Sequence, residues 1–222
     1  MTHPNMSKYI NRREIADYAT NIALAILYLI FSVYFFMRFL IIFKTTFVNF
    51  SNFKETLLII LYFLTQISWA ALFLLRKKPI SSDKKISSWI YGGLGTFLPL
   101  FFSFTKLRTN FILEATTIIG AIIAFYSILC LGKSAGIIPS NRGIVKHGLY
   151  AYIRHPMYLG YIILFFSFLI MSNPDIYKFI LISIWIFSIY KRIILEEEFL
   201  GKYKDYLNYI KEVKFRLIPL IW

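Results

Sequence analysis

Cysteine and acidic residues are scarce in this sequence. The 222 residues include one cysteine, Cys130, which excludes an internal disulfide, a CxxC redox pair and a zinc site built from several thiolates. The glycines at 92, 93 and 95 do not complete a GxGxxG pattern and follow no expected strand, so a Rossmann nucleotide site is excluded as well. Because 11 acidic residues stand against 25 lysines and arginines, the formal net charge is +14.

The basic surplus has two interpretations, nucleic acid binding or contact with a membrane. Basic residues that flank apolar segments usually set membrane topology or face anionic lipid headgroups. The basic residues of this chain lie mostly between long apolar segments. We therefore expect membrane lipid as a partner and no nucleic acid.

Apolar residues dominate the composition. They make up 58% of the chain, against about 45 to 50% in ordinary soluble domains. They gather into segments that approach the roughly 20 residues needed to cross a bilayer. The sequence predicts an all-α, polytopic membrane protein with about six transmembrane helices. The expected segments are 18–43, 55–75, 87–104, 111–131, 157–171 and 176–195.

The distribution of Lys and Arg predicts an orientation. With six spans, 19 of the 25 basic residues fall on the side that holds both termini, and 6 fall on the other side. The positive-inside rule then places both termini in the cytoplasm. This orientation corresponds to the cell membrane of a prokaryote or the endoplasmic reticulum of a eukaryote.

The C-terminal part of the chain is organised differently from the rest. Residues 172–175 (SNPD) are turn-forming and join the last two spans as a tight helical hairpin. The longest cytoplasmic connection, 132–156, mixes glycine and proline with basic and aromatic residues, which is typical of an ordered loop. We divide the chain into residues 1–131, with four helices, and residues 132–222, with the loop, the hairpin and an amphipathic tail. The tail is expected to lie on the membrane surface or to cover the loop.

Two polar clusters lie at the cytoplasmic ends of the hairpin helices. One contains Tyr150, Arg154, His155 and Tyr158, and the other contains Arg192 with the glutamates 196–198. Antiparallel pairing predicts that these clusters meet. Three carboxylates at a helix C-terminus oppose the helix dipole at about 0.3 to 1 kcal/mol each, which a bound cation would compensate. The alternatives stay open: His155-Pro156 as an ordinary helix start, and the glutamates as a charge run facing water.

Two motifs carry a resemblance to a known family. The run GIVKHGLYAYIRHPMYLG at 143–160 and the run RIILEEEFL at 192–200 resemble the paired motifs of the isoprenylcysteine carboxyl methyltransferases and related phospholipid methyltransferases. The order of the motifs and the intervening hairpin also agree, over about the last 90 residues. One departure is Leu149, which stands where the family usually has proline, so we expect a less rigid loop there.

The resemblance implies an integral membrane methyltransferase that uses S-adenosylmethionine (SAM). We expect no metal site. By this resemblance Arg192 would hold the acceptor, and Glu197 would support or orient that arginine. The residues implied to line the cofactor site are Ile144, Val145, Gly148, Tyr150, His155, Pro156, Met157, Tyr158 and Glu196.

The acceptor implied is a lipophilic small molecule or a lipid-modified substrate, most simply a carboxylate, as in isoprenylcysteine carboxyl methylation. A carboxylate acceptor is already anionic and needs no general base. A phospholipid amine or a thiol would need one, with Glu197 or His155 as the candidates. The alternative function is a small transporter or lipid-binding membrane protein without methyltransferase activity.

Overall fold

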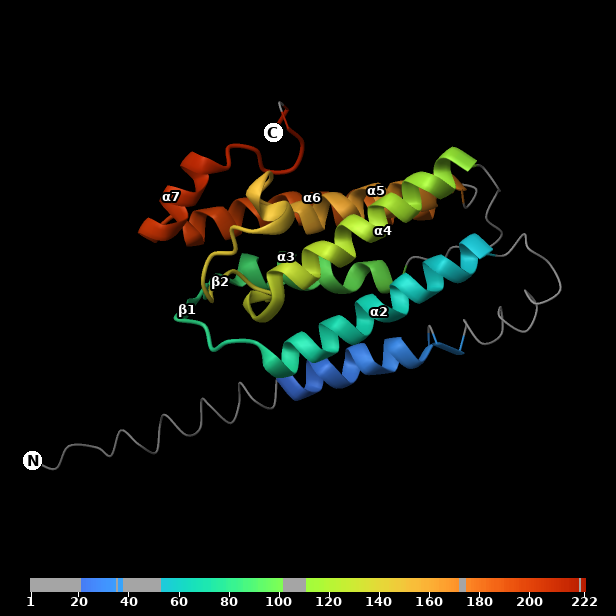
Figure 1. Ribbon diagram of the computed structural model, residues 1–222, viewed down its shortest axis with the longest axis horizontal. Helices are drawn as coiled ribbons and strands as arrows, with labels where there is room; N and C mark the ends of the chain where they lie inside the picture. Colours follow the sequence, from blue (N-terminus) through green and yellow to red (C-terminus); the bar gives the residue numbers. More distant parts are fainter. Residues whose placement is uncertain (1–20, 35, 38–52, 102–110, 172–174, 220) are drawn as a thin grey trace, which may run out of the picture.

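The computed structural model describes residues 21–34, 36–37, 53–101, 111–171, 175–219 and 221–222. The described part is mostly helical, which confirms the all-α prediction (Figure 1). Parts of the expected segments 18–43 and 87–104, the basic residues before position 21 and the turn residues 172–174 lie outside the described residues.

The helices follow the expected segments closely. α4 has the predicted bounds, α5 begins one residue earlier than predicted, and α6 continues to Leu200, beyond the predicted end at 195. The amphipathic tail forms α7. The helical elements are Asn21–Tyr34, α2 (Phe53–Leu75), α3 (Ile86–Phe97), η2 (Leu98–Phe101), α4 (Phe111–Leu131), η3 (Gly132–Ser134), η4 (Gly148–Ala151), α5 (Pro156–Met171), α6 (Ile176–Leu200) and α7 (Lys204–Glu212).

The connection between α2 and α3 pairs with the connection between α4 and α5, a contact that no sequence pattern predicted. β1 (Ser81–Ser82) pairs antiparallel with β2 (Ser140–Asn141). The peptide nitrogen of Lys77 donates to the carbonyl of Lys133 at 2.9 Å, and Arg142 Nε donates to the carbonyl of Lys77 at 3.0 Å. The connection after α2 therefore fixes the loop that precedes α5.

Close packing of α4 against α5 depends on two glycines. A Cβ built on Gly160 would lie 2.5 Å from the peptide nitrogen of Ala124, and one on Gly120 would lie 2.7 Å from that of Leu164. Small residues at such positions let helix backbones approach closely, as is common between membrane helices. α5 packs mainly on α4, while α6 packs mainly on α3. The last two helices thus pack more extensively on other helices than on each other, although their polar ends meet.

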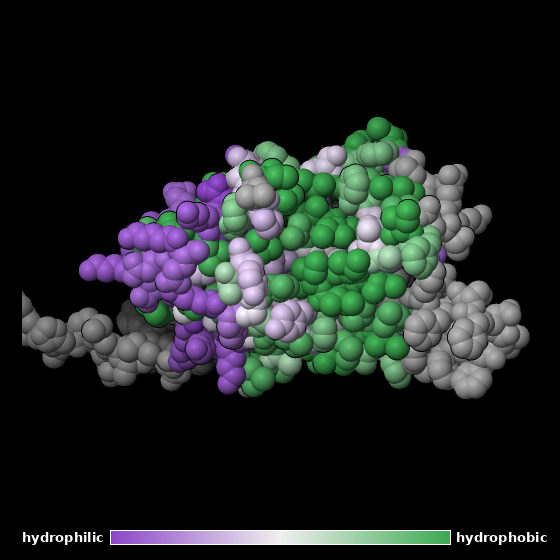
Figure 2. Space-filling model, turned by 45° about the horizontal axis from the view of Figure 1, so that its top comes forward, coloured by the Kyte–Doolittle hydropathy of each residue, from purple (hydrophilic) through white to green (hydrophobic). Residues whose placement is uncertain are grey.

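The surface divides into a hydrophilic end and an apolar region. On the face shown in Figure 2, hydrophilic residues gather at one end and apolar residues cover the helical part beside them. Large apolar side chains such as Trp89, Ile119 and Phe179 are at least half exposed on α3, α4 and α6. Such an extended apolar surface is typical of contact with lipid.

One helix in the described part of the chain, Phe111–Ser134, is long and apolar enough to cross a membrane by length and composition. Asn21–Tyr34, Phe63–Leu75 and Pro156–Met171 are apolar but shorter. α6 is longer than α4 but carries Lys178, Lys191 and Arg192. The six predicted spans and their orientation stay a prediction.

Candidate active site

The site begins at the short helix η4, directly before α5. Gly148 has φ +61°, and a Cβ there would collide with Cys130 Sγ, so the turn requires glycine. Tyr150 follows with a buried side chain. Burial, with Tyr158 and Glu196 nearby, raises the pKa of Tyr150 well above its ordinary value, so its phenol stays protonated.

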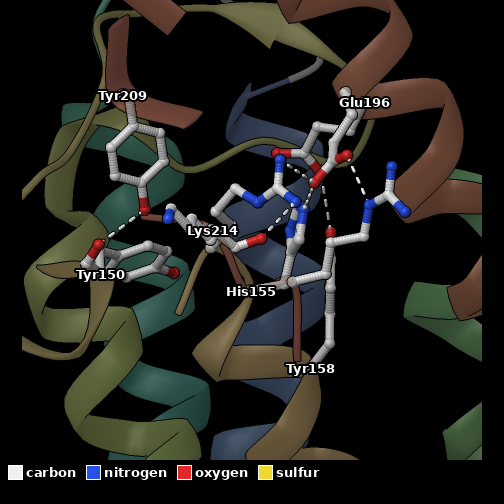
Figure 3. A network of polar contacts seen from close by, with 9 residues as sticks. Tyr150, His155, Tyr158, Glu196, Tyr209 and Lys214 are labelled. Atoms are coloured by element: carbon white, nitrogen blue, oxygen red, sulfur yellow. Dashed lines mark hydrogen bonds and ion pairs between the residues drawn. The ribbon is translucent and has the colours of Figure 1, made fainter. Parts of the chain in front are cut away.

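The first turn of α5 and the end of α6 meet as predicted. The hydroxyl of Tyr158 donates to Glu196 Oε2 at 3.2 Å, and the rings of His155 and Tyr158 stack with centroids 5.6 Å apart (Figure 3). Pro156 starts α5, and Pro156 and Met157 are buried in its first turn. Among the described residues, the carboxylate of Glu196 has this one hydrogen bond. Glu196 therefore keeps acceptor capacity for a further donor.

Glu197 joins three parts of the chain. Its Oε1 lies 3.2 Å from Arg154 Nη1 and 3.2 Å from His155 Nε2, and its Oε2 accepts from Arg216 Nε at 2.7 Å. Burial disfavours the charged carboxylate, but the hydrogen bonds from His155 and Arg216 and the charges of His155 and Arg154 outweigh it. Together they hold the pKa of Glu197 below its ordinary value. Glu197 is therefore an ionised link between the loop, α6 and the C-terminal segment.

Arg192 lies over the ring of Tyr158 and is only 6% exposed. Its Nη2 donates to the carbonyl of Gly136 at 2.9 Å, and its Nη1 donates to Thr96 Oγ1 at 3.0 Å and weakly to the carbonyl of Gly92 at 3.5 Å. No carboxylate in the described part of the chain pairs with this guanidinium. A buried cation that contacts neutral groups and no carboxylate is unusual, because buried charges are normally paired.

The expected support of Arg192 by Glu197 is not a direct contact in the described structure. Glu197 binds Arg154, His155 and Arg216 instead. Glu198, the third glutamate, is exposed and pairs with Lys85 at 2.5 Å. The three adjacent glutamates therefore have three different environments, which spacing alone did not separate.

The C-terminal tail covers the loop, one of its two expected positions. The peptide nitrogens of Arg154 and His155 donate to the carbonyls of Phe215 and Arg216 at 3.0 and 2.9 Å. The hydroxyl of Tyr209 on α7 donates to the carbonyl of Tyr150 at 2.7 Å (Figure 3). The tail thus closes over the segment that connects η4 with α5.

Residues of the loop, of α3 and of the C-terminal tail add further contacts to the site. Ile144, partly buried in the loop, packs against the cluster formed by Phe199, Leu200, Tyr206, Tyr209 and Val213. Val145 is also partly buried in that loop. No role was expected for Arg216, Thr96 or Gly136 from the sequence. The spacing of Tyr206 and Tyr209 on the amphipathic tail was the available signal for the cover, whereas the contacts of Thr96 and Gly136 had none.

Within the described ranges, no group of three or more His, Cys, Asp and Glu residues is placed to hold a metal ion. The arrangement instead offers a carboxylate with free acceptor capacity, stacked aromatic rings and a buried guanidinium.

Comparison with known proteins gives one family. No curated protein matches the chain. Residues 110–202 match the sequence model of the isoprenylcysteine carboxyl methyltransferase (ICMT) family, from the start of α4 to just beyond the end of α6. Residues 1–109 and 203–222 lie outside the match. The match confirms the resemblance based on the two motifs: residues 110–202 are similar to the ICMT family of membrane methyltransferases.

Proposed function

We propose that the protein is an integral membrane methyltransferase that moves a methyl group from SAM to the carboxylate of a lipophilic acceptor. The observation that carries the choice of acceptor is Arg192, whose buried guanidinium contacts neutral oxygens and no carboxylate among the described residues. A guanidinium binds a carboxylate through two parallel hydrogen bonds. The family match over 110–202 supports the methyltransferase activity.

The described residues fit SAM. The cofactor carries an ammonium group, a carboxylate, a sulfonium and an adenine ring. Glu196 has acceptor capacity for the ammonium group, since only the hydroxyl of Tyr158 binds it among the described residues. The stacked rings of His155 and Tyr158 offer aromatic faces. Ile144, Val145, Gly148, Tyr150, Pro156 and Met157 are the further residues proposed to line the cofactor.

In the proposed mechanism Arg192 orients the acceptor, and η4, α5 and Glu196 orient the cofactor. SAM, when bound, supplies a methyl group activated by its sulfonium. Since the carboxylate is already anionic, no residue has to remove a proton. The contribution of the protein is alignment in a site from which water is excluded. Glu197 acts indirectly by holding Arg154, His155 and Arg216 together.

The membrane arrangement belongs to the same proposal. We place about six helices across the bilayer, with both termini in the cytoplasm and with residues 132–222 carrying the cofactor site. The hydrophilic end seen in Figure 2 and the exposed apolar side chains of the helices support this placement. A lipophilic acceptor then enters from the bilayer toward Arg192. No observation favours the transporter alternative.

A titration of SAM into detergent-purified protein tests the proposal. Glu196→Gln is expected to abolish saturable binding. Glu198→Gln is the matched control, since its carboxylate is exposed on the surface and pairs with Lys85. Absence of SAM binding by folded wild-type protein would overturn the proposed function.

A transfer assay then tests the acceptor class. With methyl-labelled SAM and N-acetyl-S-farnesylcysteine as the carboxylate probe, wild-type protein is expected to form a base-labile methyl ester. Arg192→Gln should retain SAM binding and lose transfer. Equal loss of folding in Arg192→Gln and Glu196→Gln would show that the polar residues form a structural network, contrary to the proposal.

A further inference from the structure

Two hydrogen-bond donors next to Glu197 have no partner within the described residues. Tyr206 on α7 is 4% exposed, and its hydroxyl is buried without a hydrogen bond. Arg154 directs Nη1 to Glu197 and Nη2 to the carbonyl of Lys214, but its Nε is also buried without a partner. A buried donor without a partner is unfavourable. Two of them in one cluster point to a group that both would bind.

Both donors belong to the same polar network. Arg154 contacts Glu197 at 3.2 Å, and the charges of Glu197, Glu196 and Arg154 all act on the hydroxyl of Tyr206. Burial raises the pKa of Tyr206 above its ordinary value, so its phenol remains a neutral donor. The hydrogen bond from Tyr209 to the carbonyl of Tyr150 holds α7 in place over this network.

The charge balance of the network favours an anion. Arg154 shares the single carboxylate of Glu197 with Arg216 and His155. The two guanidiniums therefore exceed the negative charge that Glu197 supplies. Glu196 lies near the Tyr206 hydroxyl as well, but in the proposed function its negative charge is paired with the ammonium group of SAM and does not offset the second guanidinium.

We propose that Arg154 Nε and the Tyr206 hydroxyl bind the carboxylate at the amino-acid end of SAM. This assignment rests on the proposed function, in which Glu196 binds the ammonium group of the same end. The two opposite charges of one amino acid would then have separate partners, Glu196 on α6 and the pair formed by Arg154 and Tyr206. Tyr206 lies outside the region matched by the family, so the family match does not assign it.

The test compares SAM with decarboxylated SAM, which keeps the sulfonium and the ammonium group and lacks the carboxylate. Calorimetric titration of the full chain should show about tenfold tighter binding of SAM than of decarboxylated SAM by wild-type protein, as a charge-assisted hydrogen-bond pair would give. Tyr206→Phe should remove most of this preference by weakening SAM binding alone. Arg154→Lys keeps the positive charge but lacks the guanidinium Nε, so it should also reduce the preference for SAM over decarboxylated SAM.

Two controls separate a binding role from a structural one. Tyr209→Phe removes a hydroxyl that already has a partner, so any effect should fall equally on both ligands. Tyr152 lies in the same loop as Arg154 and is 74% exposed, so Tyr152→Phe should leave the affinities for SAM and for decarboxylated SAM unchanged. Because the Tyr206 hydroxyl has no partner among the described residues, Tyr206→Phe should not lower the melting temperature of the ligand-free protein. It should reduce the rise in melting temperature that SAM produces.

The outcomes are distinguishable. If wild-type protein binds SAM, two results for Tyr206→Phe would overturn the carboxylate subsite: unchanged affinity for both ligands, or an equal loss of affinity for both. Either result would leave the proposed function standing. A lower melting temperature of ligand-free Tyr206→Phe would also contradict the subsite. Wild-type protein that binds neither ligand would overturn the proposed function and the subsite with it.

Discussion

The guanidinium of Arg192 lies over the ring of Tyr158, with 5.4 Å between Cζ and the ring centroid. The hydroxyl of the same tyrosine donates to Glu196. One side chain therefore contacts both the cation proposed for the acceptor and the carboxylate proposed for the cofactor. The ring holds the two opposite charges at separate positions, which keeps each available for its own ligand.

Tyr158→Phe separates these two contacts. The ring under Arg192 remains and the hydrogen bond to Glu196 is lost. A hydrogen bond to a charged group is worth about 1.5 to 3 kcal/mol. Because Glu196 loses the hydrogen bond that orients it, we expect SAM to bind about tenfold or more weakly. Calorimetric titration measures the change. Unaltered affinity would mean that Tyr158 does not orient Glu196.

Glu197→Gln should destabilise the protein strongly. The carboxylate of Glu197 is 10% exposed and contacts Arg154, His155 and Arg216. Removing one partner of a buried ion pair costs about 3 to 5 kcal/mol, because the remaining charges stay buried. Thermal unfolding in detergent measures the loss. Glu198→Gln is the control, because its exposed pair with Lys85 should contribute at most about 1 kcal/mol.

Glu197 also predicts a pH dependence of stability. Its pKa is lower in the folded protein than the ordinary value of 4.5. A carboxylate with a lowered pKa stabilises the fold above its unfolded-state pKa, and this contribution is lost as the pH falls through the folded-state pKa. We expect the melting temperature to decrease as the pH is lowered below about 4.5. A decrease of the same size in Glu197→Gln would show that other carboxylates cause it.

The helices were predictable because their signals are local. A continuous apolar run bounded by polar residues defined α4 at both ends, and Pro156 marks the start of α5. The predicted apolar segment ends at Leu195, and the glutamates 196–198 were expected at the C-terminal end of the same helix, where the structure places them. The helix continues to Leu200 because these glutamates have partners elsewhere: Tyr158 for Glu196 and three basic residues for Glu197.

The sequence predicted which two polar clusters meet at the site, but not which side chains within them bind each other. The hairpin correctly predicted that His155 and Tyr158 meet the glutamates of α6. The choice of partner was not predictable, because it depends on which way each side chain turns at the helix end. Glu197 binds Arg216, and Arg192 binds the carbonyl of Gly136. Arg216 and Gly136 both lie outside the hairpin formed by α5 and α6. No periodicity in the sequence encodes such contacts.

Gly160→Ala should force α4 and α5 apart. Its added Cβ would lie 2.5 Å from the peptide nitrogen of Ala124 and 2.8 Å from the carbonyl oxygen of Gly120, and helix backbones cannot yield as a flexible side chain would. Overpacking of this kind costs about 1 to 3 kcal/mol, so we expect a lower melting temperature. Because Gly160 lies in the turn after Tyr158, SAM binding should weaken as well. Gly93→Ala is the matched control, since a Cβ on that helical glycine meets nothing within 4 Å and alanine is the better helix former. An equal loss of stability in both variants would show that helix flexibility, and not the close contact between α4 and α5, makes Gly160 necessary.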